Sequence, residues 1–289
     1  MNAKQARWLM LPALLLLAAV FFWPLLRYAW LSGHADTVLT GLVPVPNGGA
    51  NWLRLLQDAR FWQDTSQTLR FALVSVSLEL LLGLALALLL DQPRRLGGGL
   101  RAITLLPWAL PTTVMALGWR WILNDPYGPL NSWLRLFGVQ PYGFLTTPAT
   151  TWLFTVLADV WKTTPFVALL LLAGLQTIPE DLREALRLEG ASPLQILGSL
   201  VLPLLMPWIT LALLFRLASA LGVFDLIQVL TAGGPAGSTE TLALYAYLNA
   251  MRFLDFGYSA TIVLATFLLL LALSLAWLAA QSRSAWRTR

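Results

Sequence analysis

Long, continuous runs of apolar residues are the feature that most constrains this chain. About six of them reach the roughly 20 residues that a helix needs to cross a bilayer. Within these runs apolar and polar residues do not alternate, which favours helices over the strands of a membrane barrel. We therefore predict an all-α, polytopic membrane protein with a single transmembrane domain. The predicted spans are Trp8–Leu31, Thr68–Leu90, Arg101–Leu123, Trp152–Leu175, Ile196–Ala220 and Tyr258–Ala280.

The composition agrees with a membrane protein and excludes several kinds of site. Of the 289 residues, 58% are hydrophobic and 11% are charged, whereas soluble domains carry about 25% charged residues. There is no cysteine, and His34 is the single histidine. A disulfide framework, a thiolate nucleophile and a metal site built from cysteine or histidine are therefore not expected, and we predict no cofactor bound by this chain.

The first apolar run could also be a secretory signal peptide, because Lys4 and Arg7 precede it. Its apolar core is longer than the roughly 7–15 residues of a signal peptide, and no small-residue cleavage site stands out. We expect the run to be retained as the first span.

Arginine and lysine in the short loops predict the orientation. Cytoplasmic loops of membrane proteins carry an excess of these residues. The poorer side has Arg54, Arg60, Arg135 and Arg252, spread over longer segments. We expect both termini to be cytoplasmic in a plasma or inner membrane. The richer, cytoplasmic side has Lys4, Arg7, Arg94, Arg95, Arg101, Arg183, Arg187, Arg283, Arg287 and Arg289.

Three outer segments have recognisable local patterns. Residues 51–67 have helical periodicity and are expected to lie along the outer face. Asp125–Pro129 and Ala232–Pro235 are turn signals, because glycine and proline cluster in them.

The two lysines show that this chain does not carry a phosphate-binding P-loop. Lys4 precedes Gln5 and Lys162 follows Trp161, whereas a P-loop requires Gly-Lys followed by serine or threonine. If ATP and magnesium drive this protein, a partner subunit binds them.

Residues 178–203 interrupt the apolar sequence with a charged stretch on the predicted cytoplasmic side. Pro179 followed by Glu180 and Asp181 is a good helix start, and Gly190 can end that helix in a left-handed conformation. Ser192 followed by Pro193 begins a second short helix. The sequence predicts a helical elbow, either lying on the lipid surface or fitting a groove of a partner protein.

The spacing within this stretch resembles the Glu-Ala-Ala loop of ABC import permeases. Glu184-Ala185 is followed by Gly190 after six positions and by Leu202-Pro203 thirteen positions later. Leu186 and Leu200 replace the usual alanine and isoleucine. The resemblance implies the type I importer permease fold and a coupling helix that seats on an ATPase subunit. The residues implied in coupling are Arg183, Glu184, Ala185, Arg187, Glu189, Gly190, Ala191, Ser192 and Pro193, with Arg183, Arg187 and Glu189 on a polar rim.

A second segment resembles carbohydrate-uptake permeases of the maltose type. Thr231-Ala-Gly-Gly-Pro235 matches their Thr-x-Gly-Gly-Pro segment, and residues 161–166 (WKTTPF) also look like that group. The likeness is to the first of the two permease subunits. It implies four partners: a second homologous permease, two ATP-binding subunits and an extracytoplasmic sugar-binding protein. A disaccharide such as trehalose or maltose is the expected solute, with glycerol phosphate as a competitor.

Five ionisable residues fall within or next to the predicted spans: Glu79, Asp159, Lys162, Arg216 and Asp225. Charges in the hydrocarbon region are costly and face the bundle interior or a water-filled path. Asp159 and Lys162 are three residues apart and could pair with each other. Glu79 is expected to pack or to bond between helices. Lys162 and Arg216 could donate to sugar hydroxyls or form salt bridges with Asp159 or Asp225.

The same resemblance places the solute path on the fourth and fifth spans. Ala220 and Val223 cannot donate hydrogen bonds, which departs from the maltose-specific members, and Phe166 could stack on a sugar ring. The implied path residues are Lys162, Thr163, Phe166, Arg216, Ser219, Ala220 and Val223.

Two other classes of protein are alternatives to the importer. An ion-coupled secondary transporter would use Glu79, Asp159 and Lys162 as a relay, without an ATPase. A membrane enzyme acting on a lipid-linked sugar would need paired acids or a metal site at the membrane surface, which the sequence does not offer. The importer, a non-catalytic transport subunit, is the preferred interpretation.

Overall fold

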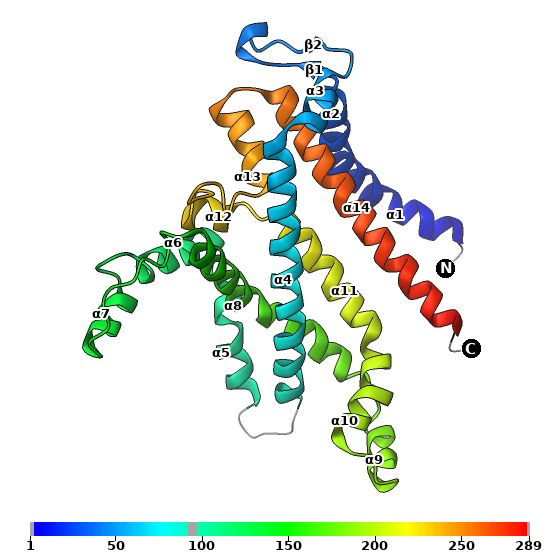
Figure 1. The fold of residues 1–289 in the computed structure, drawn as a ribbon. Coiled ribbons are helices and arrows are strands. Elements are labelled where there is room, and N and C mark those ends of the chain that lie inside the picture. Colours follow the sequence, from blue (N-terminus) through cyan, green and yellow to red (C-terminus); the bar gives the residue numbers. More distant parts are fainter. Residues whose placement is uncertain (1–2, 92–96, 288–289) are drawn as a thin grey trace. The chain divides into compact units, whose positions relative to one another are not determined.

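The structure, a computed structural model, describes residues 3–91 and 97–287. Arg94, Arg95 and Arg289, which contributed to the predicted orientation, lie outside these residues. The chain forms two compact units, which are described separately: unit 1 is Met1–Thr65 with Leu242–Arg289, and unit 2 is Ser66–Thr241. The elements of each unit are labelled in Figure 1.

Unit 1 joins the two ends of the sequence. A π-helical turn (Ala18–Phe22) links α1 to α2, and another (Leu248–Arg252) follows α13. A 3-10 turn (Val38–Thr40) lies between the strands, and the first residues of α4 complete the unit. Its elements are α1 (Ala3–Leu17), α2 (Trp23–Ser32), β1 (His34–Ala35), β2 (Val45–Pro46), α3 (Ala50–Gln57), α13 (Leu242–Tyr247) and α14 (Phe256–Arg287).

Helices α2 and α14 pack side by side in unit 1. The antiparallel hairpin of β1 and β2 pairs His34 with Pro46. Asn51 fixes the chain after α2, because its amide nitrogen donates to the carbonyl oxygens of Ser32 (3.1 Å) and His34 (2.9 Å). Aromatic and aliphatic side chains from α3, the first turn of α4, α13 and α14 form the core. Its buried residues are Leu55, Phe61, Leu242, Tyr245, Ala246, Tyr258 and Ile262.

A carboxylate in unit 1 is held by two tyrosines. Asp58 Oδ2 accepts hydrogen bonds from the hydroxyls of Tyr245 (2.6 Å) and Tyr258. Burial alone would raise the pKa of Asp58, but the tyrosine hydroxyls and nearby backbone amides lower it below its ordinary value. For Tyr245, burial and the hydrogen bond to Asp58 raise the pKa to about 12. The cluster ties α13 and α14 to the segment between α3 and α4.

Unit 2 contains the middle of the chain. Most of α4 (Ala59–Leu90) lies in it, and a π-helical turn (Leu197–Val201) connects α10 to α11. Its other helices are α5 (Gly97–Ala109), α6 (Thr112–Ile122), α7 (Pro129–Leu136), α8 (Pro148–Leu175), α9 (Glu180–Leu188), α10 (Pro193–Ile196), α11 (Leu202–Leu221) and α12 (Asp225–Leu230).

Two glycines let the long helices of unit 2 approach closely. A Cβ atom at Gly83 of α4 would lie 2.6 Å from Val167 Cγ1 of α8. A Cβ atom at Gly174 of α8 would lie 2.5 Å from the indole of Trp208 on α11. Small residues at such contacts are typical of helix pairs in membranes. They bring α4, α8 and α11 together around one apolar core.

The lengths of the helices agree with the predicted spans, with one difference. Among the described residues, five helices are long and apolar enough to cross a membrane: Met10–Ser32, Ala59–Leu90, Pro148–Leu175, Pro193–Leu221 and Phe256–Gln281. The third predicted span is not one straight helix. It is a pair, Ala102–Ala109 and Thr112–Ile122, bent by 92°. Leu110 precedes Pro111, and a proline disfavours the helical conformation of the residue before it. The helix is therefore broken at this point.

Candidate functional site

The charged stretch forms the predicted elbow, at one end of unit 2 (Figure 1). Helix α9 begins after Pro179 with Glu180 and Asp181 in its first turn. The chain turns at Gly190, where φ is +84°. Ser192 caps α10: its hydroxyl accepts from the amide of Gln195, whose side chain accepts from the amide of Ser192. The predicted left-handed turn and the predicted cap are confirmed.

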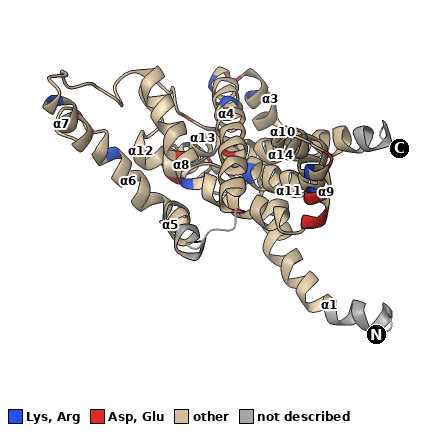
Figure 2. Ribbon diagram, turned by 90° about the horizontal axis from the view of Figure 1, so that it is seen from below, with Lys and Arg blue, Asp and Glu red and all other residues tan. Residues whose placement is uncertain are grey.

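The outer surface of the elbow combines charge with exposed leucines. Figure 2 shows acidic and basic residues on α9. Glu184 and Ala185 are exposed, and so are Leu182, Leu188 (90% exposed) and Leu194. Leucines exposed this far on a short amphipathic helix indicate a contact surface for another protein.

Arg183 does not lie on the polar rim where the sequence analysis placed it. Its side chain is only 14% exposed, and its Nη1 atom lies 2.8 Å from Asp91 Oδ2 at the end of α4. Its Nη2 atom donates to the carbonyl of Leu175 at the end of α8 (3.2 Å). Arg187, by contrast, pairs with Glu180 at 3.0 Å and stays exposed. Arg183 therefore fastens the elbow to two of the long helices.

A groove of about 960 Å³ lies beside the elbow. The ion pair of Asp91 with Arg183 forms part of its wall, and Leu194 and Val201 contribute apolar surface. The groove is continuous with the exposed face of α10.

A second group of charges lies inside unit 2, between α4, α8 and α11. Glu79, Asp159 and Arg216 are all buried. The Arg216 Nη2 atom lies 2.8 Å from Glu79 Oε1 and 3.0 Å from Asp159 Oδ2, and its Nε atom donates to Glu79 Oε2. Thr163 donates its hydroxyl to Glu79 (2.5 Å). One guanidinium thus binds two carboxylates, and both bonds to Glu79 form a bidentate pair.

Lys162 is not paired with Asp159, although the two residues are three apart on α8. Among the residues that the structure describes, no ion pair joins them within 4.0 Å. The Lys162 Nζ atom instead donates to the carbonyl oxygens of Leu110 (2.8 Å) and Trp108 (3.4 Å), where the third span is broken. Phe166, one turn further along α8, stacks on Trp108 with ring centroids 5.7 Å apart.

Residues 79–287 match a family of known proteins described as the binding-protein-dependent transport system inner membrane component. The chain belongs to this family. It is therefore the membrane component of an ABC transporter and not the ATPase. The match contains both the elbow and the buried charges.

The permease is similar over nearly its whole length to several characterised relatives. It is 43% identical to the trehalose/maltose transport system permease protein of Thermococcus litoralis, covering 96% of this chain and 93% of the relative. It is 35% identical to the sulfoquinovosyl glycerol permease of Agrobacterium fabrum (93% and 88%). It is also 35% identical to the trehalose permease of Mycobacterium tuberculosis (90% and 82%).

Among solved structures, the permease has the fold of a bacterial ABC transporter involved in the import of the acidic polysaccharide alginate. The TM-score is 0.82 at 20% identity, and the match covers 97% of this chain and 96% of that one. A second structure, of the alginate transporter in complex with its alginate-bound periplasmic protein, gives a TM-score of 0.79 over 94% and 92%. The predicted all-α permease fold is confirmed.

The structure brings together only some of the expected path residues. Lys162, Thr163, Phe166 and Arg216 lie near one another through the contacts described above. Ala220 is buried, and the hydroxyl of Ser219 donates to the backbone of its own helix at Phe215. The carbonyl of Val223 accepts a hydrogen bond from the hydroxyl of Thr241 (3.0 Å).

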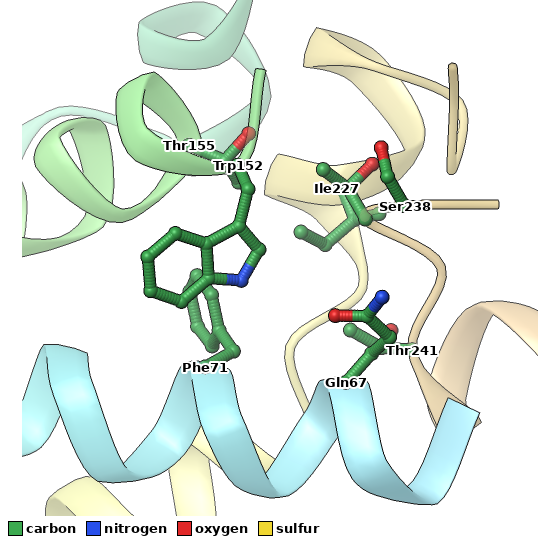
Figure 3. A pocket seen from close by; sticks show the side chains of 8 residues that line it. Gln67, Phe71, Trp152, Thr155, Ile227, Ser238 and Thr241 are labelled. Carbon is green, nitrogen blue, oxygen red and sulfur yellow. The ribbon is translucent and has the colours of Figure 1, made fainter. Parts of the chain in front are cut away.

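The Thr-x-Gly-Gly-Pro segment is held by Thr239, whose hydroxyl bonds with that of Thr231 (2.7 Å) and donates to the carbonyl of Gly234 (3.0 Å). Ser238, Thr239 and Thr241, which follow this segment, line a pocket with Gln67, Phe71, Trp152, Thr155 and Ile227. In it the indole of Trp152 points toward Phe71 and Gln67 (Figure 3). The pocket is too narrow to hold a water molecule. In this conformation it is a packing contact of residues 238–241 and not a binding cavity.

Proposed function

We propose that this permease imports a sugar, a disaccharide such as trehalose or maltose, into the cytoplasm by alternating access. ATP-binding subunits supply the energy, and an extracytoplasmic sugar-binding protein delivers the solute. The observation that carries the proposal is the capped elbow of α9 and α10, with its exposed Glu184, Leu188 and Leu194. It is an exposed surface of charged and apolar side chains at the end of the helices that hold the buried charges.

The elbow is built to transmit force. Helix α10 continues through a π-helical turn into α11, and Arg183 ties α9 to the ends of α4 and α8. A displacement of the elbow by ATPase subunits, each carrying ATP and magnesium, would therefore act on three long helices at once. The second half of the pathway would come from a homologous permease subunit. This arrangement requires the elbow and both termini to be cytoplasmic.

The disaccharide is favoured by the relatives and by the contacts that Arg216 and Lys162 already make. Two relatives are named for trehalose. Arg216 is already bound to two carboxylates, and Lys162 donates to two backbone carbonyls. An anionic solute such as glycerol phosphate would have to displace Arg216 from its carboxylates or Lys162 from its carbonyls. A neutral sugar needs only hydrogen-bonding groups and an aromatic surface, which Thr163 and Phe166 could supply.

The test is uptake by the complete transporter in proteoliposomes. The purified assembly, with its binding protein outside and ATP inside, is given labelled trehalose, maltose or glycerol phosphate. We expect ATP-dependent accumulation of a disaccharide and none of glycerol phosphate. Accumulation of glycerol phosphate alone would contradict the assigned solute.

The same vesicles separate the importer from an ion-coupled transporter. An importer requires ATP and is inactivated by Glu184→Lys. Uptake that needs an ion gradient but no ATP, survives Glu184→Lys and is lost in Asp159→Asn would establish the relay of Glu79, Asp159 and Lys162 instead.

A further inference from the structure

The break in the third span leaves backbone carbonyls at the end of α5 without helical partners. Helix α5 ends at Ala109, α6 begins at Thr112, and the two are bent by 92°. Pro111 has no N–H group and therefore cannot donate back to α5. Within the hydrocarbon region water is absent, and each unpaired carbonyl is costly. A break at this position needs another donor.

Lys162 of α8 supplies that donor. Its ammonium group is 2.8 Å from the Leu110 carbonyl and 3.4 Å from the Trp108 carbonyl. A cation at a helix C-terminus also interacts favourably with the helix dipole. The lysine therefore performs the task of a C-cap, from a different helix.

Two side chains on one face of α8 hold the end of α5. Phe166 follows Lys162 by one helical turn and stacks on Trp108 at 5.7 Å, with an angle of 20° between the rings. Helix α8 thus contacts the backbone at the break through Lys162, and it contacts the side chain of Trp108 through Phe166.

The same part of α8 carries the buried ion network. Asp159, one turn before Lys162, binds Arg216 of α11 at 3.0 Å. Helix α11 follows directly from the elbow. The elbow is therefore linked to the break through helix α11, the ion pair of Arg216 with Asp159, and helix α8, which carries Lys162.

We propose that Lys162 is a positioning residue that holds the joint between α5 and α6 in its bent form. The position of α8 then sets the angle of the joint, because the donor moves with α8. Lys162 does this through the backbone of α5 and need not touch the solute. The cap is independent of the proposed function, whereas the use of the joint during transport rests on it.

The absence of cysteine makes the bend directly measurable. Cysteines introduced at Ile103 of α5 and Leu117 of α6, both exposed in this chain, would carry spin labels. Double electron–electron resonance on the complete assembly in nanodiscs then reports the distance across the joint. The variants are Lys162→Met, which removes charge and donors at similar length, and Lys162→Arg, which keeps both. Leu157→Met, an exposed position on α8, is the matched control.

We expect Lys162→Met to lengthen and broaden the distance distribution, and Lys162→Arg and Leu157→Met to preserve it. The maximal uptake rate of Lys162→Met should fall, because a joint that is no longer held in its bent form slows the change between the two conformations. Its KM should stay unchanged. A normal distance in Lys162→Met overturns the proposal, and a raised KM found together with it would show that Lys162 binds solute instead.

Two further outcomes are also decisive. If Lys162→Met does not assemble, Lys162→Gln replaces it, since glutamine is neutral and too short to reach the break. If the distance in Lys162→Gln equals the distance in Lys162→Arg, the proposal is contradicted. If the labelled wild-type assembly imports neither trehalose nor maltose while the distances change as expected, the solute assignment fails and the role of Lys162 stands.

Discussion

Arg216 of α11 binds Glu79 of α4 and Asp159 of α8, so one side chain joins three helices of unit 2. Both carboxylates are buried, and 137 sequence positions separate Glu79 from Arg216. A buried ion pair contributes little relative to apolar residues of the same size, but its cation is costly to remove once the carboxylates are buried. Its role in this fold is to specify which helices meet.

Removal of the shared cation should destabilise the permease strongly. Arg216→Met leaves two buried carboxylates without their partner, and we expect the free energy of unfolding to fall by about 3–5 kcal/mol. Thermal unfolding of the purified permease measures this. Arg120→Met, an exposed arginine that donates to the Val229 carbonyl, should cost about 1 kcal/mol or less.

The triple variant Glu79→Gln, Asp159→Asn, Arg216→Met separates charge from packing. With all three charges removed, much of the stability lost in Arg216→Met should return. A triple variant as unstable as the single one would show that packing, and not the unpaired charge, causes the loss.

The two arginines of α9 should differ in how firmly they hold the elbow. Arg183 is sheltered and binds Asp91 at 2.8 Å, whereas Arg187 and Glu180 are both more than half exposed. In Arg183→Gln, hydrogen exchange of the α9 amides should accelerate on the order of tenfold, because a sheltered charged hydrogen bond is lost. In Arg187→Gln it should change by about twofold at most.

An exchange of charges tests the direct contact. The double variant Asp91→Arg, Arg183→Asp should recover part of the lost protection of α9. Equal acceleration in Arg183→Gln and Arg187→Gln would refute the assigned tether.

The hydroxyl of Tyr245 should lose its proton at a higher pH than an ordinary tyrosine. Its pKa is raised from 10.0 to about 12, because it is buried and donates to Asp58. The raised pKa means that the folded state favours neutral tyrosine. This stabilisation is complete below pH 10.0 and is lost as the pH rises through about 12.

Ultraviolet absorbance measures the ionisation of tyrosine. In Tyr245→Phe, the titration curve should lose one step near pH 12. The step should remain in Tyr127→Phe, whose side chain is exposed. A step that Tyr245→Phe leaves in place would contradict the assignment.

Features that depend on neighbouring residues in sequence could be predicted. Apolar length located the spans within several residues at most ends, because the bilayer sets the length of a helix. Glycine and capping chemistry located the turn at Gly190 and the start of α10 at Ser192, because both interactions are local.

Features that depend on contacts between residues far apart in the sequence could not be predicted. Asp91 and Arg183 are 92 positions apart, and no local pattern indicates that they meet. Pro111 was visible in the sequence, but Pro165 and Pro207 lie inside intact helices. A proline in a membrane helix therefore does not by itself predict a break. The role of Lys162 follows only from the position of that break.

The elbow of α9 and α10 is the proposed binding site for an ATPase subunit. Co-purification from the native membrane tests it most directly: tagged wild-type permease is compared with Glu184→Lys and with Asp125→Lys, an exposed acid in the loop after α6. We predict that an ATP-binding subunit and a second permease co-elute with the wild type and with Asp125→Lys, and that the ATP-binding subunit is lost in Glu184→Lys. Either of two results would contradict this assignment: the wild-type chain elutes without an ATP-binding subunit, or the ATP-binding subunit still co-elutes with Glu184→Lys.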